Sequence, residues 1–304
     1  MVRKVFVTGA TGYLGSAIAV RLLRAGSQVH GLTRSPQRAR ALAAAGIEAV
    51  VGSFDEPRGV VSEMKNCDAV VHASVDEQDQ AAKDQVALET IRTAAQDGRV
   101  RRVLYTSGVW VHGDTGGALV DETAPLAAPE TVRWRPAHEH AALSLAEVEV
   151  ATVVLRPGVV YGERRGIIGG WFQEAKSLGT VTYPGTGEQH WGLVHRDDMA
   201  EAYALALEHG LSGERYLLVD ESRFTVRELA EAVARAAGAR AVATDAQAFA
   251  RQDGPSGAAK LMDQRFTSAR ARRGLGWVPR HTNFVAEADA LLREWEAAAQ
   301  AAVG

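Results

Sequence analysis

Val5-Phe6-Val7-Thr8-Gly9-Ala10-Thr11-Gly12-Tyr13-Leu14-Gly15 combines a short apolar run with three glycines spaced three residues apart. The apolar residues 5–7 predict a buried strand, and residues 17–23 have the apolar spacing of a helix. Between a strand and a helix, Gly9 permits a tight turn, Gly12 lets the backbone approach a pyrophosphate, and Gly15 allows close helix packing. The helix N-terminus then attracts phosphate. The segment predicts a dinucleotide site that uses Gly9, Thr11, Gly12, Tyr13, Leu14 and Gly15.

Composition limits the class of protein. The chain has 304 residues, of which 46% are hydrophobic, enough for a substantial core, and its net charge of −3 argues against a nucleic-acid-binding surface. Residues 1–4 run directly into a strand and leave no room for a signal peptide, and no stretch is typical of a transmembrane span. The single cysteine, Cys67, fits a reducing compartment. We therefore expect a soluble, cytoplasmic protein without a metal site.

Strands and helices alternate along the first half of the chain. Further strands are predicted at 28–34, 47–52, 68–74, 103–107 and 151–156, with helical segments between them. This alternation predicts an α/β fold with a Rossmann-type, doubly wound parallel sheet. Ligands of such sheets bind at the carboxyl ends of the strands. The candidate residues at these ends are Gly9 to Gly15, Arg34, Ser53, Ala73, Ser107 and Pro157.

The end of the second strand selects between the two nicotinamide cofactors. An acidic residue there binds the ribose 2′-hydroxyl of NAD(H), whereas a cation binds the 2′-phosphate of NADP(H). This chain has Arg34 in that place and Arg38 one helical turn later, with no acid beside them. A guanidinium can bind a phosphate through two parallel hydrogen bonds. We therefore predict NADP(H) in preference to NAD(H); the alternative is that Arg34 is a solvated loop residue.

Three motifs together resemble a known superfamily. They are Thr8-Gly9-x-x-Gly12-x-x-Gly15, Arg156-Pro157-Gly158-x-x-Tyr161-Gly162, and Val194-His195-Arg196-Asp197-Asp198. They resemble the extended or atypical branch of the short-chain dehydrogenase/reductases, which includes epimerase/dehydratase-like proteins. The resemblance implies an NADP(H)-binding domain at 1–162. It also implies a smaller, mainly helical substrate lobe at 163–304, of which about 190–220 returns to the Rossmann core.

The resemblance also assigns cofactor contacts beyond the glycine turn. Ser53 and Phe54 occupy the position that borders the adenine ring, although the superfamily usually has Asp-Leu or Asp-Val there. The segments after the fourth, fifth and sixth strands wall the cofactor. The implied contacts are Ala73, Ser74, Thr106, Pro157, Gly158 and Val159, with Arg135 binding the nicotinamide ribose.

The acid–base pair of the superfamily is missing. Its oxidoreductases use Tyr-x-x-x-Lys, in which the tyrosine passes a proton to or from the substrate oxygen. No Tyr-x-x-x-Lys occurs in this chain; the best alignment places Thr131 at the tyrosine and Arg135 at the lysine, with Glu139 at a common glutamate. Arginine can still bind ribose hydroxyls, but a threonine hydroxyl is too weak an acid to replace tyrosine.

Three other side chains are candidates for the missing chemistry. The usual hydroxyl after the fifth strand is replaced by Gly108, which leaves Ser107 as the nearest hydroxyl. His138 and His112 are candidate acid–base groups, because imidazole titrates near neutrality; the alternative for each is a structural histidine. His72, which closes a strand, is interpreted as structural.

Aromatic residues suggest the nature of the substrate. Trp110, Tyr161, Trp171 and Trp191 fall in segments that should border the substrate side, which favours an apolar or aromatic small molecule. We predict an NADPH-dependent oxidoreductase that reduces a carbonyl. The alternatives are an NAD(P)-dependent epimerase or dehydratase and a non-catalytic NADP(H)-binding redox sensor. The sequence carries no signal for the number of subunits.

Overall fold

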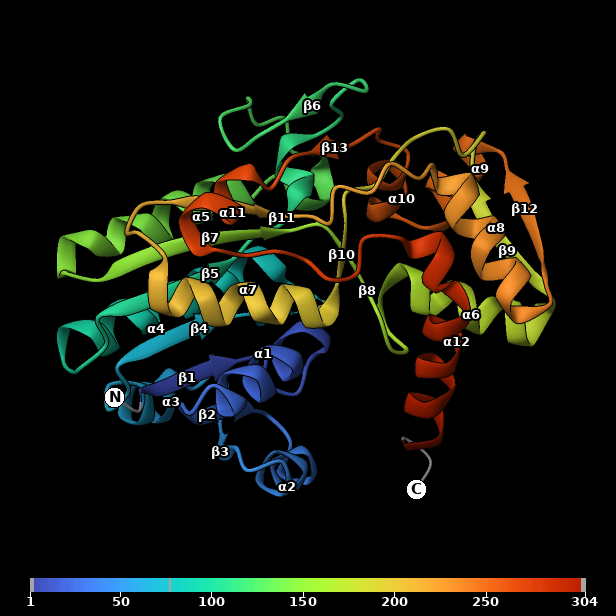
Figure 1. Cartoon of the computed structure of the whole chain (residues 1–304). Helices are drawn as coiled ribbons and strands as arrows, with labels where there is room; N and C mark the ends of the chain where they lie inside the picture. The colour runs from blue at the N-terminus through green and yellow to red at the C-terminus, as the bar shows by residue number, and fades with distance from the viewer. Residues whose placement is uncertain (1–2, 77, 302–304) are drawn as a thin grey trace.

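A computed structural model of the chain describes residues 3–76 and 78–301. Its centre is a seven-stranded sheet in which every pair of neighbouring strands is parallel (Figure 1). In spatial order the strands are β11 (Arg215–Leu218), β7 (Ala151–Pro157), β5 (Arg102–Thr106), β4 (Ala69–His72), β1 (Lys4–Thr8), β2 (Gln28–Thr33) and β3 (Glu48–Val51). The order reverses beside β1, as in a Rossmann-type sheet, so the predicted fold class is confirmed.

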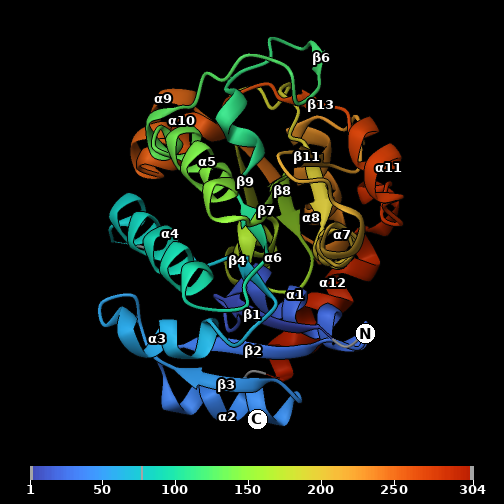
Figure 2. The same ribbon diagram turned by 90° about the vertical axis from the view of Figure 1, so that its left-hand side faces the viewer.

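Helices cover both faces of the sheet (Figure 2). Apolar side chains of one face pack with helices α1 (Tyr13–Arg24), α2 (Pro36–Ala44), α7 (Arg196–His209) and α11 (Ala269–Leu275). The opposite face packs with α3 (Pro57–Met64), α4 (Gln80–Gln96), α5 (Arg135–Leu143) and the 3-10 turn η3 (Ser144–Val148). The strands are buried on both sides, which is why they appear in the sequence as continuous apolar runs rather than alternating ones.

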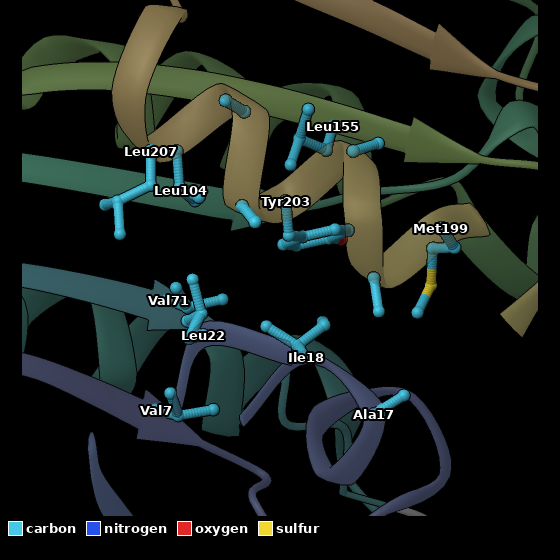
Figure 3. Close-up of a cluster of buried hydrophobic side chains, with 14 of the residues drawn as sticks. Val7, Ala17, Ile18, Leu22, Val71, Leu104, Leu155, Met199, Tyr203 and Leu207 are labelled. Carbon is cyan, nitrogen blue, oxygen red and sulfur yellow. The ribbon is translucent and has the colours of Figure 1, made fainter. Parts of the chain in front are cut away.

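The largest buried cluster joins two helices that are far apart in the sequence. Helix α7 lies beside α1 on the same face, and Tyr203 points between them toward the sheet (Figure 3). Ile18 and Leu22 of α1 meet Met199 and Leu207 of α7 in this cluster. Residues 196–218 therefore belong structurally to the sheet, although they lie in the sequence between the segments that build the lobe.

The C-terminal lobe lies at one end of the sheet (Figure 1). It contains helices α6 (Gly166–Leu178), α8 (Val226–Ala237), α9 (Ala246–Gln252), α10 (Pro255–Lys260) and α12 (Phe284–Ala301). A parallel pair, β9 (Thr180–Pro184) with β12 (Arg240–Thr244), packs against α6 and α8. A second parallel pair, β8 (Val159–Tyr161) with β10 (Leu193–His195), connects the lobe to the sheet.

Short elements complete the segment above the sheet. The 3-10 turns η1 (Val109–His112) and η2 (Glu130–Val132) follow β5, and β6 (Leu119–Val120) pairs with β13 (Arg265–Phe266). Residues 107–134 therefore separate β5 from α5. They bring the segment that contains Thr131 back over the end of the sheet.

The turn between β1 and α1 has no room for side chains at two of its glycines. Gly9 has φ +69°, and a Cβ on it would lie 2.7 Å from the carbonyl oxygen of Ala73. A Cβ on Gly15 would lie only 2.1 Å from the carbonyl oxygen of Gly9. Helix α1 therefore contacts the turn backbone directly, as the glycine spacing predicted.

Because of this close contact, we expect Gly15→Ala to change the stability in the opposite direction from a usual Gly→Ala substitution in a helix. In a helix interior, Gly→Ala normally stabilises a protein by about 1 kcal/mol. At Gly15 the new methyl group displaces the turn, so Gly15→Ala is expected to lower the free energy of unfolding by about 1–3 kcal/mol, as overpacking does. Urea denaturation measures the change. Gly170→Ala in α6 is the control, because a Cβ there meets nothing within 4 Å; equal effects of the two substitutions would refute the packing explanation.

Candidate active site

A cavity of about 660 Å³ lies at the carboxyl ends of β1, β2, β3 and β4. We call it the strand-end cavity. Among its lining residues are Gly9, Thr11, Gly12, Arg34, Ser53, Phe54, Ala73 and Ser74, each of which the sequence predicted as a cofactor contact. The structure thus brings these residues together around one space, as expected where parallel strands end on the same edge.

The backbone of this cavity fits a dinucleotide. The amide of Gly12 donates to the carbonyl of Gly9 at 2.7 Å and closes the turn, and Gly12 caps α1 without a side chain. The first turn of α1 carries no acidic residue that would compete with an anion. A helix N-terminus that has no side-chain cap and lies beside a glycine turn is the arrangement that binds a pyrophosphate.

Arg34 lies at the mouth of the strand-end cavity. Its guanidinium is 71% exposed and donates from Nη1 to Asp76 Oδ2 at 3.1 Å. Asp76 is held in place because its Oδ1 accepts from the amide of Gln78 at 3.0 Å. The hydrogen bond from the amide of Gln78, together with the positive charge of Arg34, lowers the pKa of Asp76. Arg38 lines the same cavity.

A second cavity, of about 340 Å³, adjoins the first and shares Val75 and Gln80 with it. We call it the central cavity. It is lined by Tyr13, Leu14, Ser107, Thr131, Arg135, Pro157, Gly158 and Val159, among others. The structure therefore places the residues that align with the superfamily's tyrosine, lysine and strand-end hydroxyl around one space.

Ser107 and Arg135 are the polar groups of most chemical interest in the central cavity. The side chain of Ser107 is buried, and its Oγ makes no hydrogen bond to any described residue. Arg135 donates from Nη1 to the carbonyl oxygen of Thr106 at 3.1 Å, and its guanidinium carbon lies 4.5 Å from the centre of the Trp134 ring. A positioned cation and an unpaired hydroxyl can together stabilise negative charge on an oxygen.

Two predicted cofactor residues act indirectly. Gly15 packs on the turn, as described above. The hydroxyl of Thr106 accepts a hydrogen bond from Tyr203 at 2.8 Å and so faces α7; its carbonyl instead orients Arg135.

Tyr13 does not supply a mobile proton. Its hydroxyl donates to the carbonyl of Gly162 at 2.7 Å. Burial is the main cause that raises the pKa of Tyr13 above its ordinary value; the nearby Arg196 only partly opposes it. Tyr13 therefore remains a neutral phenol at any working pH.

His138, which the sequence predicted as a candidate acid–base group, lines neither the strand-end cavity nor the central cavity. Its Nδ1 lies 2.7 Å from Asp84 Oδ2, and its ring packs edge-on against Trp134 with the ring centres 4.8 Å apart. Arg135 lines the central cavity, whereas His138 is hydrogen-bonded to Asp84 of α4.

His112 is likewise placed away from the central cavity. Arg156 Nη1 donates to His112 Nε2 at 2.9 Å, and Arg156 also pairs with Glu139 at 2.6 Å. All three side chains are buried. Burial, followed by the positive charge of Arg156, lowers the pKa of His112 to about 4. His112 and Glu139 thus serve to hold a buried arginine.

A third space, the tryptophan cleft, has a volume of about 760 Å³ and shares Trp110 and Ile167 with the central cavity. Trp171 and Trp191 stack in its wall, with ring centres 5.4 Å apart. Tyr161, which the sequence predicted to border the substrate, lines none of these three spaces. Tyr161 is fully buried, and its ring packs against Phe284 and His195 at 5.2 Å.

Asp84 is a residue that the sequence analysis missed. It lies on the buried face of α4, in register with Ala87, Leu88 and Ile91, and it lines the strand-end cavity. A carboxylate in an otherwise apolar helical stripe requires partners, and this was the available signal. Its partners are His72, Tyr105 and His138.

The sheet order, the glycine turn and the adjoining cavities define an NAD(P)-binding enzyme of the Rossmann type. Residues 5–218 match the model of the NAD dependent epimerase/dehydratase family, and the chain belongs to that family. The predicted membership and the prediction of an enzyme are thereby confirmed, in place of a non-catalytic sensor.

Relatives with known names include reductases. A 4-hydroxy-2-methyl-3-oxo-4-farnesyl-3,4-dihydroquinoline-1-oxide ketoreductase of Stigmatella aurantiaca is 26% identical over 74% of this chain and 70% of its own. A 2-alkyl-3-oxoalkanoate reductase of Stenotrophomonas maltophilia is 27% identical over 78% of this chain and 76% of its own. An uncharacterized protein of Schizosaccharomyces pombe is 28% identical over 93% and 97% of the two chains.

Solved structures share the fold. A dTDP-glucose 4,6-dehydratase from Streptomyces venezuelae with NAD bound superimposes with a TM-score of 0.81, over 97% of this chain and 99% of its own, at 21% identity. Within residues 3–76 and 78–301, no helix is both long enough and apolar enough to cross a membrane.

The pKa of His112 predicts a pH dependence of stability. The histidine binds a proton below about pH 6.5 when the chain is unfolded but only below about pH 4 when it is folded. Between these values the unfolded state binds the extra proton, so His112 makes the protein less stable as the pH falls. In urea denaturation, His112→Gln is expected to lose less free energy of unfolding than wild type between pH 6.5 and pH 4.5.

The exposed His140 on α5 provides the matched control. His140→Gln should follow the wild-type pH dependence. Parallel curves for wild type and His112→Gln would show that His112 titrates alike in both states.

Proposed function

We propose that this enzyme reduces a ketone or related carbonyl on a small apolar or aromatic molecule, with NADPH as the reductant. One observation carries the proposal: the unpaired hydroxyl of Ser107 and the guanidinium of Arg135 line a central cavity that opens into the tryptophan cleft. The names of the two bacterial reductases among the relatives support the same reaction class.

The preference for NADPH rests on Arg34 and Arg38. A 2′-phosphate at the end of β2 would meet both guanidinium groups in the strand-end cavity. The ion pair between Arg34 and Asp76 is exposed to solvent on the arginine side, so it contributes little to the stability of the free protein. A doubly charged phosphate can therefore replace the carboxylate at little cost.

The residues of the central cavity divide the chemistry between them. When bound, the reduced nicotinamide supplies a hydride equivalent. Ser107 donates a hydrogen bond to the carbonyl oxygen of the substrate, and Arg135 stabilises the negative charge that develops there. Among the described residues of this cavity, Tyr13 keeps its proton near neutral pH because burial raises its pKa, and Arg135 acts as the cation rather than as a proton donor. The alkoxide oxygen therefore takes its proton from water.

The charges of the tryptophan cleft favour an apolar substrate over a nucleotide sugar. Lys260 is already paired with Asp253 at 2.7 Å, and Glu174 accepts from the amide of Thr182 at 3.1 Å. Lys260 is the one cation among the described lining residues, so a pyrophosphate would lack positive partners in the cleft. The partly exposed Trp110, Ile167 and Phe249 instead offer apolar surface in the cleft.

Replacing Arg34 tests the cofactor preference. Arg34→Ala is expected to weaken NADPH binding about tenfold, which corresponds to about 1.4 kcal/mol, and to leave NADH binding unchanged. Titration with each cofactor, followed by quenching of tryptophan fluorescence, measures both affinities. Arg24→Ala removes the same charge from an exposed site at the far end of α1 and should change neither. Equal losses for both cofactors would eliminate Arg34 as the selector.

Replacing Ser107 tests the reaction. With a panel of aromatic and alkyl ketones, wild type is expected to consume NADPH, and Ser107→Ala to lower kcat about 100-fold without changing the NADPH affinity. Thr131→Val should lower kcat by less than about threefold, because a threonine hydroxyl is a poor proton donor. The absence of NADPH consumption by wild type across the panel would overturn the proposal.

A further inference from the structure

Asp84 belongs to a hydrogen-bonded network with Thr8, His72, Tyr105 and His138, which come from four different elements; the last three contact Asp84 directly. Asp84 Oδ1 lies 3.0 Å from His72 Nε2, and Oδ2 lies 2.8 Å from the hydroxyl of Tyr105 and 2.7 Å from His138 Nδ1. His72 Nδ1 in turn lies 2.9 Å from the hydroxyl of Thr8. Thr8, His72 and Tyr105 are each at most 1% exposed, and Asp84 is 6% exposed. Neither the reaction described above nor the cofactor contacts use this network.

The charge of Asp84 fixes the direction of each hydrogen bond. Burial opposes ionisation of Asp84, but the hydrogen bonds from His138, His72 and Tyr105 outweigh it and hold the pKa of the carboxyl well below its usual range. An ionised carboxylate only accepts hydrogen bonds. The three neighbours therefore all donate to it, and His72 carries a proton on Nε2.

The direction of the hydrogen bonds is also fixed from His72 through Thr8 to the backbone of Ala73 and Ser74, which line the strand-end cavity. The Thr8 oxygen has two lone pairs, and both are used by backbone amides, so its one hydrogen is left for His72 Nδ1, which accepts it at 2.9 Å. The two lone pairs of the Thr8 oxygen then accept from the amides of Ala73, at 3.1 Å, and Ser74, at 3.2 Å. Every donor and acceptor along this path is satisfied.

Ala73 and Ser74 line the strand-end cavity, and the carbonyl of Ala73 lies against Gly9. The position of these two residues thus determines the shape of the glycine turn opposite. We propose that Asp84 is a positioning residue for the cofactor: by fixing the tautomer of His72, it orients the Thr8 hydroxyl and holds the Ala73–Ser74 backbone against the glycine turn. This inference goes beyond the proposed reaction, because it concerns any nicotinamide cofactor that the cavity binds.

Asp84→Asn keeps the size of the side chain and changes only the hydrogen bonds that it can make. The two donors that converge on Oδ2, from Tyr105 and His138, fix the amide oxygen of the new side chain on their side. Its NH2 group then faces His72 Nε2, which must become an acceptor, and the proton moves to Nδ1. The Thr8 oxygen then faces three donors with two lone pairs, so one amide of the wall loses its partner.

Tyr105→Phe is the matched control. It removes one hydrogen bond from the same carboxylate but leaves His72 on Oδ1, so the direction of the path to Thr8 does not change. A role confined to stability would affect both variants alike. A role in orientation would separate them in cofactor affinity and in the tautomer of His72.

The experiment measures three quantities on the full chain. NMR of ¹⁵N-labelled histidine, assigned with the His72→Asn variant, reports the tautomer of His72; thermal unfolding reports stability; fluorescence titration reports NADPH and NADH affinity. We expect the Nε2–H tautomer in wild type and Tyr105→Phe and the Nδ1–H tautomer in Asp84→Asn. Asp84→Asn should bind NADPH and NADH about tenfold more weakly, and Tyr105→Phe within about twofold of wild type.

Three results would overturn the proposal: an Nδ1–H tautomer in wild type, an unchanged tautomer in Asp84→Asn, or equal cofactor affinities of Asp84→Asn and Tyr105→Phe. If Asp84→Asn does not fold, Thr8→Val and Thr8→Ser provide the same test one step closer to the wall. Thr8→Val should lose affinity and Thr8→Ser should retain it; equal affinities would also refute the inference. A wild type that binds neither cofactor would refute the proposed function instead, and the NMR result would still judge the network.

Discussion

The contact between the α1 backbone and the turn after β1 is the constraint on which the rest of the structure depends. With no side chain at Gly15, the helix can lie against the carbonyl of Gly9, and with none at Gly9 the turn can lie against Ala73. This stack of backbones places the helix N-terminus at the edge of the sheet where β1 and β4 end. Larger residues at these positions would lift α1 away from the sheet and open its packing against α7.

The sequence was sufficient to predict the sheet and much of the cavity wall, for a physical reason. Each buried parallel strand is an apolar run, and the carboxyl ends of parallel strands converge at one edge. Residues as far apart as Gly12, Ser53 and Ser107 could therefore be assigned to one site without knowledge of any side-chain contact. The resemblance to the family added Thr131 and Arg135, and both line the central cavity beside Pro157.

Side-chain direction was the part that the sequence could not supply. His138 and Arg135 are three residues apart on α5, and the sequence could not show that Arg135 lines the cavity while His138 pairs with Asp84. Tyr161 belongs to the motif at 156–162, but its side chain packs in the core of the lobe, where β8 pairs with β10. Asp84 was missed because its partners come from β4, β5 and α5, whose proximity exists only in the folded chain.

The chain adds the last strand of the sheet only after it has begun the lobe, and this order limits how the lobe could be exchanged in evolution. Between β7 and β11 the chain builds α6 and three of the lobe's strands, and only afterwards does β11 pair with β7. The edge of the nucleotide-binding half is therefore closed by residues encoded after the first part of the substrate half. A lobe embedded in this way cannot be exchanged between relatives by simple fusion at one junction, since any transplanted segment must also supply a strand that completes the sheet of its host.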